Sequence, residues 1–171
     1  MARGILILGS NLGNREDMID RAREMINEKA GKIVKSSSIF KTEPWGFEAD
    51  NKFLNQAIMI ETELDPQHLL ITLMEIEDSL GRKRKTVQFE SRLIDIDILF
   101  YDDKIIDEKD LQIPHPRIRE RMFVLKPLME IAGEMIHPEI KKTISELYND
   151  CKDKLEVEVY QQASEGSSNN I

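Results

Sequence analysis

The hydrophobic pattern at the start of the chain alternates between a short apolar run and a longer amphipathic stretch. Residues 5–8 form the continuous run Ile-Leu-Ile-Leu, which ends at Gly9 and predicts a strand buried on both faces. Apolar residues then recur at helical spacing through residues 14–29, where Asn14 is a candidate N-cap and Gly31 a stop signal. The pattern therefore predicts strand, turn and helix in that order.

The rest of the pattern predicts further strands and helices, separated by prolines and glycines. Residues 32–41 and 53–61 are predicted strands on either side of a Pro-Gly loop, and residues 66–80 form an amphipathic helix closed by Gly81. The remaining predicted elements are a central strand at 93–101, a hairpin-like piece at 102–106, a loop at 114–116, helices at 118–132 and 144–151, and an edge strand at 155–160.

The order of these elements is β-α-β-β-α-β, followed by extra C-terminal helices. Hairpin-paired strands with helices packed on them predict an α+β fold with a ferredoxin-like core and a mostly antiparallel sheet. Since neither a repeat nor a linker interrupts residues 1–160, we expect one domain there. Residues 161–171 are polar and rich in Ser, Asn and Gly, so we expect a disordered tail.

The composition excludes several functional classes. The chain of 171 residues has 40% apolar and 33% charged residues, and its net charge of −8 argues against a general nucleic-acid or anionic-membrane surface. No apolar run approaches the roughly 18–20 residues of a membrane span. Because Cys151 is the single cysteine and no secretory signal pattern is present, we expect a cytoplasmic location. P-loop, dinucleotide-binding and serine-hydrolase patterns are missing from the sequence.

Two aspartates, Asp95 and Asp97, stand inside the predicted central strand. Side chains two apart on a strand share a face, and two carboxylates between leucines repel each other unless something neutralises them. A divalent cation does this, and oxygen ligands alone favour Mg²⁺ over zinc. The alternatives are pairing with arginines or a strand face open to water. Strict alternation directs the other side chains of this strand to the opposite face: Ile94, Ile96, Ile98 and Phe100.

A cluster of cations precedes the two aspartates. Arg82 and Arg84 belong to the run Arg-Lys-Arg-Lys, and Arg92 stands at the end of a long charged loop. Guanidinium groups neutralise charge on transferring phosphate oxygens while metal-bound carboxylates hold the polyphosphate, so this combination suits phosphate chemistry. The alternative is a solvated loop with no such task.

Five more side chains are ligand candidates, each with a structural alternative. His115 is fixed between two prolines and precedes Arg121, but it also suits a structural histidine followed by a solvated helix face. Glu77 lies at the edge of the apolar stripe of its helix, where a surface carboxylate is the alternative. Phe53 and Asn55 share a strand face, and an aromatic beside an amide suits a flat heterocycle, although it also suits core packing.

Short motifs occur in one order over about residues 5–140. The most specific is Arg-x-x-Asp-x-Asp-Ile at 92–98. The others are Leu-Gly-Ser-Asn-Leu-Gly at 8–13, Thr-Glu-Pro-Trp-Gly at 42–46, Phe-Leu-Asn at 53–55, Glu77 with Gly-Arg-Lys-Arg at 81–84, Pro-His-Pro at 114–116, Arg121 with Phe123, and Pro-Leu at 127–128. Together these motifs resemble the 6-hydroxymethyl-7,8-dihydropterin pyrophosphokinase family of folate biosynthesis.

The resemblance implies a reaction and a set of site residues. Pyrophosphate would pass from Mg-ATP to the hydroxyl of 6-hydroxymethyl-7,8-dihydropterin, giving the pterin diphosphate and AMP with no covalent enzyme intermediate. Asp95 and Asp97 would bind two Mg²⁺ ions, and Arg82 and Arg92 would be catalytic by stabilising the transferring group. The implied ATP contacts are Glu77, Arg84, Ile98, His115 and Arg121. The implied pterin contacts are Thr42, Glu43, Trp45, Phe53, Asn55 and Phe123, with the ring stacked between the two phenylalanines.

Two departures from the family pattern are visible. Phe89-Glu90-Ser91 stands where Trp-Gly-Pro is frequent, and Phe53 stands where tyrosine is common. Because the chain ends soon after the resembling region, we expect a stand-alone enzyme. We also expect a monomer whose partners are ATP and the pterin, without nucleic-acid or membrane partners. Two other functions stay open at this point: another Mg-dependent nucleotidyl- or phosphotransferase, and a non-catalytic α+β module that binds a small ligand.

Overall fold

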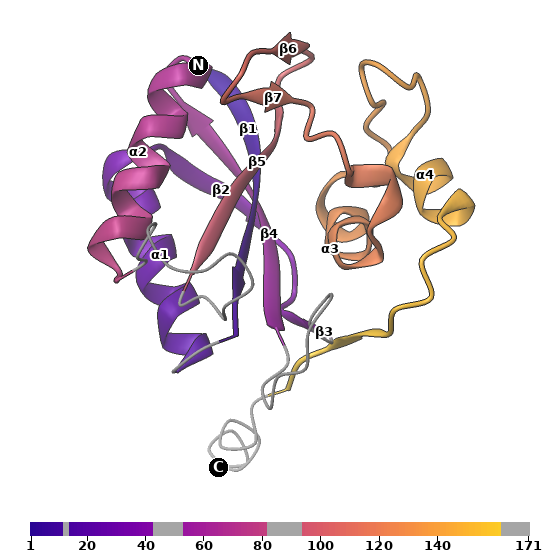
Figure 1. The fold of residues 1–171 in the computed structure, drawn as a ribbon, viewed down its shortest axis with the longest axis horizontal. Coiled ribbons are helices and arrows are strands. Elements are labelled where there is room, and N and C mark those ends of the chain that lie inside the picture. The colour runs from indigo at the N-terminus through magenta and orange to yellow at the C-terminus, as the bar shows by residue number, and fades with distance from the viewer. Residues whose placement is uncertain (12–13, 43–52, 82–93, 162–171) are drawn as a thin grey trace.

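The computed structural model of the protein describes residues 1–11, 14–42, 53–81 and 94–161 (Figure 1). A six-stranded sheet has the order β5-β1-β4-β3-β8, with β2 also pairing with β4, and every described pair is antiparallel. The elements are β1 (Ala2–Ser10), α1 (Arg15–Lys29), β2 (Lys32–Ser36), β3 (Phe40–Thr42), β4 (Phe53–Thr62), α2 (Pro66–Ser79), β5 (Asp95–Tyr101), β6 (Ile106–Asp107), β7 (Gln112–Ile113), a 3-10 turn (Ile118–Glu120), α3 (Met122–Ala132), α4 (Ile144–Asp150) and β8 (Val157–Val159).

The predicted α+β fold with a ferredoxin-like core is confirmed. From β1 to β5 the chain runs β-α-β-β-α-β, with the second strand divided into β2 and β3. The first strand lies between the last two, because β1 pairs with both β4 and β5. Each helix crossing thus returns the chain to a strand that runs antiparallel to its neighbours.

Helices cover both faces of the sheet (Figure 1). On one face, Leu6 and Leu8 of β1 pack in a core with residues of α1 and α2. On the other, Ile5 and Ile7 pack in a second core with residues of α3 and α4. The prediction that this apolar run is a strand buried on both faces is therefore confirmed, and each such side chain contributes about 1.5–3 kcal/mol by burial.

The predicted face of Phe100 is wrong. The register between β1 and β5 shifts by one residue, so that Leu6 lies opposite Ile98 but Ile5 lies opposite Phe100. A bulge of this kind places two consecutive side chains on nearly the same side. Phe100 and Leu99 consequently both belong to the core under α3 and α4, where the Phe100 ring meets the His137 ring edge-on with centroids 5.5 Å apart.

The predicted strand at 32–41 is two strands, because serine side chains interrupt the ladder. The Ser37 hydroxyl accepts a hydrogen bond from Ala57 N at 3.0 Å and donates to Ser38 O at 2.7 Å. Ser38 N in turn donates to the carboxylate of Glu130 on α3 at 2.7 Å. Such local side-chain bonds compete with regular strand pairing, and residue type alone does not reveal where they win.

The predicted helix at 118–132 is also divided, into the 3-10 turn and α3. Arg121 between them has an extended backbone, with φ −126° and ψ 108°. Farther back, the piece predicted as hairpin-like at 102–106 is a turn, and the hairpin that follows consists of β6 and β7. The predicted helix at 144–151 and edge strand at 155–160 are present as α4 and β8, each slightly shorter.

The ends of the first two helices follow the predicted signals. The Asn14 side chain accepts from Asp17 N and caps α1, while α2 is followed, after its C-cap Leu80, by Gly81, whose φ of 98° favours glycine. Gly31 has a different role: a side chain there would collide with Glu61 O of β4. In the part of the chain that is described, no helix has the length and apolar character needed to cross a membrane.

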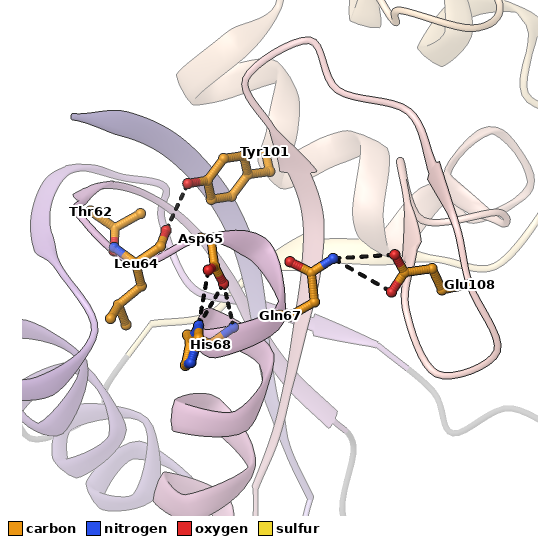
Figure 2. A network of polar contacts seen from close by, with 7 residues as sticks. All are labelled: Thr62, Leu64, Asp65, Gln67, His68, Tyr101 and Glu108. Carbon is orange, nitrogen blue, oxygen red and sulfur yellow. Dashed lines mark hydrogen bonds and ion pairs between the residues drawn. The ribbon is translucent and has the colours of Figure 1, made fainter.

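The start of α2 is tied to the far end of β5 (Figure 2). Asp65 accepts from His68 N at 2.8 Å as the N-cap, and the Tyr101 hydroxyl donates to Leu64 O at 2.6 Å. Gln67 Nε2 donates to the Glu108 carboxylate of the β6–β7 hairpin at 3.2 Å. These contacts lie at the Tyr101 end of β5, so they leave the Asp95 end for the side chains considered next.

Candidate active site

Most of the described candidate residues gather at one end of the sheet. At this end β1 and β3 finish while β4 and β5 begin, because the strands are antiparallel. Asp95, Gly9 and Asn55 stand opposite one another in a row across three strands. With strands 4.7–4.9 Å apart, the outer two α-carbons are about 10 Å apart. The row lies on the face that α3 partly covers, since the next row along contains Ile7 and Ala57 of that core.

Gly9 leaves room at the centre of this row for the side chain of Asn55. A β-carbon at Gly9 would lie 2.9 Å from Asn55 Oδ1, closer than real β-carbons approach an oxygen. Asn55 is almost fully buried, and its Nδ2 donates to Thr42 Oγ1 at 3.2 Å. At this end of the sheet, Gly9 therefore lies between a carboxylate on β5 and an oriented amide on β4.

Asp95 and Asp97 are both half-buried, as the shared strand face requires. Arg121 lies near both carboxylates, and Arg117 lies near Arg121. Burial lowers the pKa of Arg121 and the charge of Arg117 lowers it further, whereas the carboxylates of Asp97, Glu120 and Asp95 raise it. An arginine keeps its charge under such shifts. Opposite charges thus face each other across the end of β5.

His115 is oriented by the backbone on both sides. The backbone N–H of His115 donates to Leu99 O of β5 at 3.0 Å. The ring Nδ1 accepts from Arg117 N at 3.2 Å. Burial lowers the pKa of His115, Arg121 and Arg117 lower it further, and Asp95 raises it. A neutral imidazole whose Nδ1 is an acceptor carries its proton on Nε2. His115 can therefore donate from Nε2 to an anion or a nucleotide base at neutral pH.

Arg121 and Phe123 flank the first residue of α3. The Arg121 guanidinium carbon lies 5.6 Å from the centroid of the Phe123 ring, within range of a cation–π contact. Both side chains are half-buried, so each retains surface for a ligand. Phe53 is likewise half-buried at the start of β4, opposite Thr42 in the register.

Glu77 is not the surface carboxylate that its position on the helix also allowed. Only 3% of the residue is exposed, and Oε2 accepts from Ile96 N at 2.7 Å. The bond shows that the Ile96 N–H points away from β1, toward the outer edge of the sheet, where β5 lies. Because alternate residues of a strand direct their backbone groups to the same side, Ile98 also presents its N–H and C=O at this edge. A nucleotide base could pair there with the backbone.

The chain matches a known family over most of its length. The family profile described as 7,8-dihydro-6-hydroxymethylpterin-pyrophosphokinase (HPPK) matches residues 5–133. This chain belongs to that family. The prediction of the family, and with it of an ATP-dependent pyrophosphokinase acting in folate biosynthesis, is confirmed.

Named relatives are similar over different shares of their own length. The 2-amino-4-hydroxy-6-hydroxymethyldihydropteridine pyrophosphokinase of Aquifex aeolicus is 40% identical over 146 residues, which are 85% of this chain and 90% of the relative. The Bacillus subtilis protein of the same name is 41% identical over 131 residues, 76% of this chain and 78% of that protein. The folic acid synthesis protein fol1 of Pneumocystis carinii is 45% identical over 131 residues, but these are 77% of this chain and only 18% of that protein.

Solved structures agree with the fold. The wild-type HPPK-DHPS of Plasmodium falciparum, determined with STZ-DHP, superimposes with a TM-score of 0.71 at 18% identity. The match covers 86% of this chain and 43% of that one. At this low identity the likeness supports the α+β architecture of the HPPK domain and nothing finer.

The structure brings together most of the described residues that were predicted for the HPPK site. Asp95, Asp97, His115 and Arg121 form one electrostatic cluster, and Thr42 and Asn55 are hydrogen-bonded to each other. Glu77 lies on the other side of β5, within the core of α1 and α2. Five predicted residues lie outside the described segments: Arg82, Arg84, Arg92, Glu43 and Trp45. The same is true of Phe89-Glu90-Ser91 and of the tail from 162 onward.

Sequence reasoning gave no role to the end of β1. Besides Gly9, the polar residues Ser10 and Asn11 are buried there, with 0% and 1% exposure. The signal was available in the motif Gly-Ser-Asn directly after an apolar run, since buried polar side chains at a strand end are uncommon without a task. What the motif could not reveal is that Gly9 faces both Asp95 and Asn55.

Proposed function

We propose that this chain transfers a pyrophosphoryl group from Mg-ATP to the hydroxyl of 6-hydroxymethyl-7,8-dihydropterin, releasing AMP. The observation that carries the proposal is the row at the sheet end, where Asp95 and the buried amide of Asn55 stand on either side of Gly9. The Asp95 side of this row suits a metal-bound polyphosphate, and the Asn55 side suits a flat polar heterocycle. Their separation of about 10 Å leaves room for both substrates.

Asp95 and Asp97 would hold Mg²⁺, and we propose two ions. The donor set fits: two half-buried carboxylates two residues apart on one strand, with oxygen as the sole ligand atom. Within the described residues, no group of three or more His, Cys, Asp or Glu side chains could enclose a metal. This agrees with magnesium chemistry, in which one or two carboxylates share the ion with substrate phosphates and water. Bound there, the metal would neutralise charge on the ATP phosphates.

The ATP would lie along the outer edge of β5. Arg121 and the Nε2–H of His115 would donate to phosphate or ribose oxygens, and the backbone of Ile98 would pair with the base. Glu77 would not touch the base. It would affect base binding indirectly, because its carboxylate holds the backbone N–H of Ile96 on this strand. Arg82, Arg84 and Arg92 are proposed phosphate ligands.

The pterin would bind against Asn55. The amide of this residue is oriented by Thr42, so its Oδ1 can accept from the pterin N–H groups in a fixed direction. We propose that the ring stacks between Phe53 and Phe123, with Glu43 and Trp45 at its edge. Reaction would then require only that the hydroxyl be aligned with the β-phosphorus, since positioning and charge neutralisation supply most of the catalysis of phosphoryl transfer.

The proposal is tested by product analysis. The protein is incubated with ATP, Mg²⁺ and 6-hydroxymethyl-7,8-dihydropterin, and the nucleotides are separated. AMP should appear in step with consumption of the pterin. Release of ADP, or hydrolysis of ATP without the pterin, would point instead to a different phosphotransferase.

The metal ligands are tested by Asp97→Ala. We expect turnover to fall at least about 10³-fold, because the lost carboxylate leaves phosphate charge uncompensated at a low-dielectric site. The circular dichroism spectrum and melting temperature should stay close to those of the wild type. Asp103→Ala, an exposed aspartate just after β5, is the matched control and should keep wild-type turnover. An Asp97→Ala enzyme with full Mg²⁺-dependent activity would rule out the metal site.

We further propose that the enzyme acts in the cytoplasm as a monomer. A net charge of −8 and a single half-buried cysteine fit a reducing compartment and a self-repelling surface. Light scattering at micromolar concentration would decide the oligomeric state, with a mass near 19.8 kDa expected.

A further inference from the structure

The start of α3 has no cap of its own. A helix begins with N–H groups that lack partners inside the helix, and the preceding side chain usually accepts from one of them. For α3 the preceding residue is Arg121, and no side-chain cap hydrogen bond from it is found among the described residues. An arginine cannot supply one, because its side chain only donates.

A distant aspartate supplies the missing acceptor. Asp153 Oδ2 accepts from Met122 N, the first residue of α3, at 2.9 Å across 31 positions of sequence. Its other oxygen, Oδ1, accepts from Leu155 N at 2.9 Å, which fixes the carboxylate in its own segment. The negative charge also complements the positive end of the helix dipole.

The segment that carries Asp153 is anchored to the sheet beyond it. β8 follows Asp153 and pairs with β3, with Val157 opposite Thr42. In Figure 1 this last strand, in yellow, lies beside β3. Lys126 of α3 donates from Nζ to Val157 O at 2.7 Å, and the Tyr160 hydroxyl donates to Glu16 of α1. These contacts hold Asp153 at a set position relative to both α3 and β3.

Two of the proposed substrate residues flank the capped N–H. Arg121 precedes Met122 and Phe123 follows it, and their side chains contact each other. Thr42, another proposed pterin contact, is paired with Val157. The C-terminal segment at 151–160 therefore contacts both α3 and β3 beside proposed substrate residues, although it lies after the family match at 5–133.

We propose that Asp153 is a positioning residue of the active site: by capping α3 from the C-terminal segment, it holds Arg121 and Phe123 where ATP and the pterin bind. This inference rests on the proposed function, because it takes these two side chains to be substrate contacts. Asp153 itself touches no substrate. Without the cap the first turn of α3 opens in part of the molecules, and substrate binding must close it again.

The test compares Asp153→Ala with two other variants. Asp153→Asn keeps one acceptor oxygen for Met122 N, so it is the conservative rescue. Glu156→Ala is the matched control: it removes one negative charge from the same segment, and the exposed Glu156 carboxylate makes no hydrogen bond within the described part of the chain. For all three variants we measure kcat, the KM for each substrate and the melting temperature. Calorimetry measures the direct binding of 6-hydroxymethylpterin and of a non-hydrolysable ATP analogue.

We expect Asp153→Ala to raise KM and the dissociation constant for both ligands about threefold to tenfold, the usual range for loss of a cap. The kcat at saturation should change less than twofold, since saturating substrate closes the turn. Asp153→Asn should recover most of the loss, and Glu156→Ala should match the wild type. If Asp153→Ala does not fold, the proposal is tested by comparing Asp153→Asn with Glu156→Ala. We then expect KM to increase about twofold for Asp153→Asn.

Two results would overturn the proposal. One is a lower melting temperature with unchanged KM and binding constants, which would make Asp153 purely structural. The other is a lower kcat with unchanged binding. Failure of the proposed function gives a different result: a wild-type protein that releases no AMP would contradict the reaction. The calorimetric comparison would still decide whether Asp153 positions the ligand-binding side chains.

Discussion

At the scale of single residues, Gly9 shows how one missing side chain shapes the site. Its neighbours across the strands are a carboxylate on one side and a buried amide on the other. The amide of Asn55 is held by Thr42, so it has little freedom to give way. The glycine is required here by close approach and not by its backbone angles.

Replacing Gly9 by alanine should therefore damage pterin binding specifically. The new methyl group would lie 2.9 Å from Asn55 Oδ1 and would force this side chain to rotate away from Thr42. We expect KM for the pterin to rise at least about tenfold, corresponding to loss of one buried hydrogen bond, with a smaller change in KM for ATP. Steady-state kinetics with each substrate varied in turn would measure both.

Gly4→Ala is the control for this prediction. Gly4 lies on the same strand, and its added methyl group would meet Ile60 Cγ1 at 3.4 Å, an ordinary contact distance. Equal increases in both KM values for Gly9→Ala, or the same kinetic defect in Gly4→Ala, would contradict the role given to Gly9.

At the scale of elements, β5 carries the proposed metal ligands Asp95 and Asp97 on one face and is held by α2 on the other. Its start depends on the buried Glu77 carboxylate, which accepts from Ile96 N. The hydrogen bond stabilises the position of the strand between Asp95 and Asp97, so a helix on the far face holds the two proposed ligands in place.

Removing this acceptor should cost stability. In Glu77→Ala the Ile96 N–H loses its partner in a buried place, which typically lowers the free energy of unfolding by about 1–3 kcal/mol. Glu77→Gln keeps a carbonyl oxygen for the same N–H and should lose less. Urea unfolding followed by circular dichroism measures both, and a Gln variant that is less stable than the Ala variant would show that this hydrogen bond is not what matters at Glu77.

The elements also show where sequence patterns are sufficient and where they fail. The helix periodicity of α1 and α2 and the N-cap of α1 were predicted because those signals are local: for the cap, a side chain and the N–H three residues later suffice. The bulge at Leu99 was not predicted, because it depends on which residue of β1 pairs with Phe100. The same is true of the break at Ser37, which depends on bonds to β4 and α3.

At the scale of the whole molecule, two histidines link folding to pH. Burial lowers the pKa of both His115 and His137; nearby arginines lower each further, whereas Asp95 and Glu139 raise them. His137 is buried, and its Nδ1 accepts from Glu139 N and Ile140 N, an arrangement that protonation would destroy. The unfolded chain takes up these protons near its ordinary pKa of about 6.5, before the folded protein does.

The free energy of unfolding should consequently decrease as the pH falls from about 6.5 toward the lower folded-state pKa values. The lowered pKa of Asp65 has the same sign but acts only at more acidic pH, near and below 3.8. Urea titrations at intervals between pH 7.5 and 5 would measure the slope, and nuclear magnetic resonance of the imidazole signals would measure the two pKa values. Histidines that titrate at or above 6.5 in the folded protein would contradict the prediction.

The sequence by itself determined most of the secondary structure, the fold class and the family, because hydrophobic periodicity, caps and the Arg-x-x-Asp-x-Asp motif are properties of neighbouring residues. Periodicity also placed both aspartates on one face. Only the tertiary structure decided what stands across from them: Gly9 and Asn55 in one row, Arg121 and His115 nearby, and Glu77 behind the strand. It also decided that Asp153 caps α3. These relations depend on strand register and on contacts between residues about 20 to 90 positions apart in the chain, which no local pattern records.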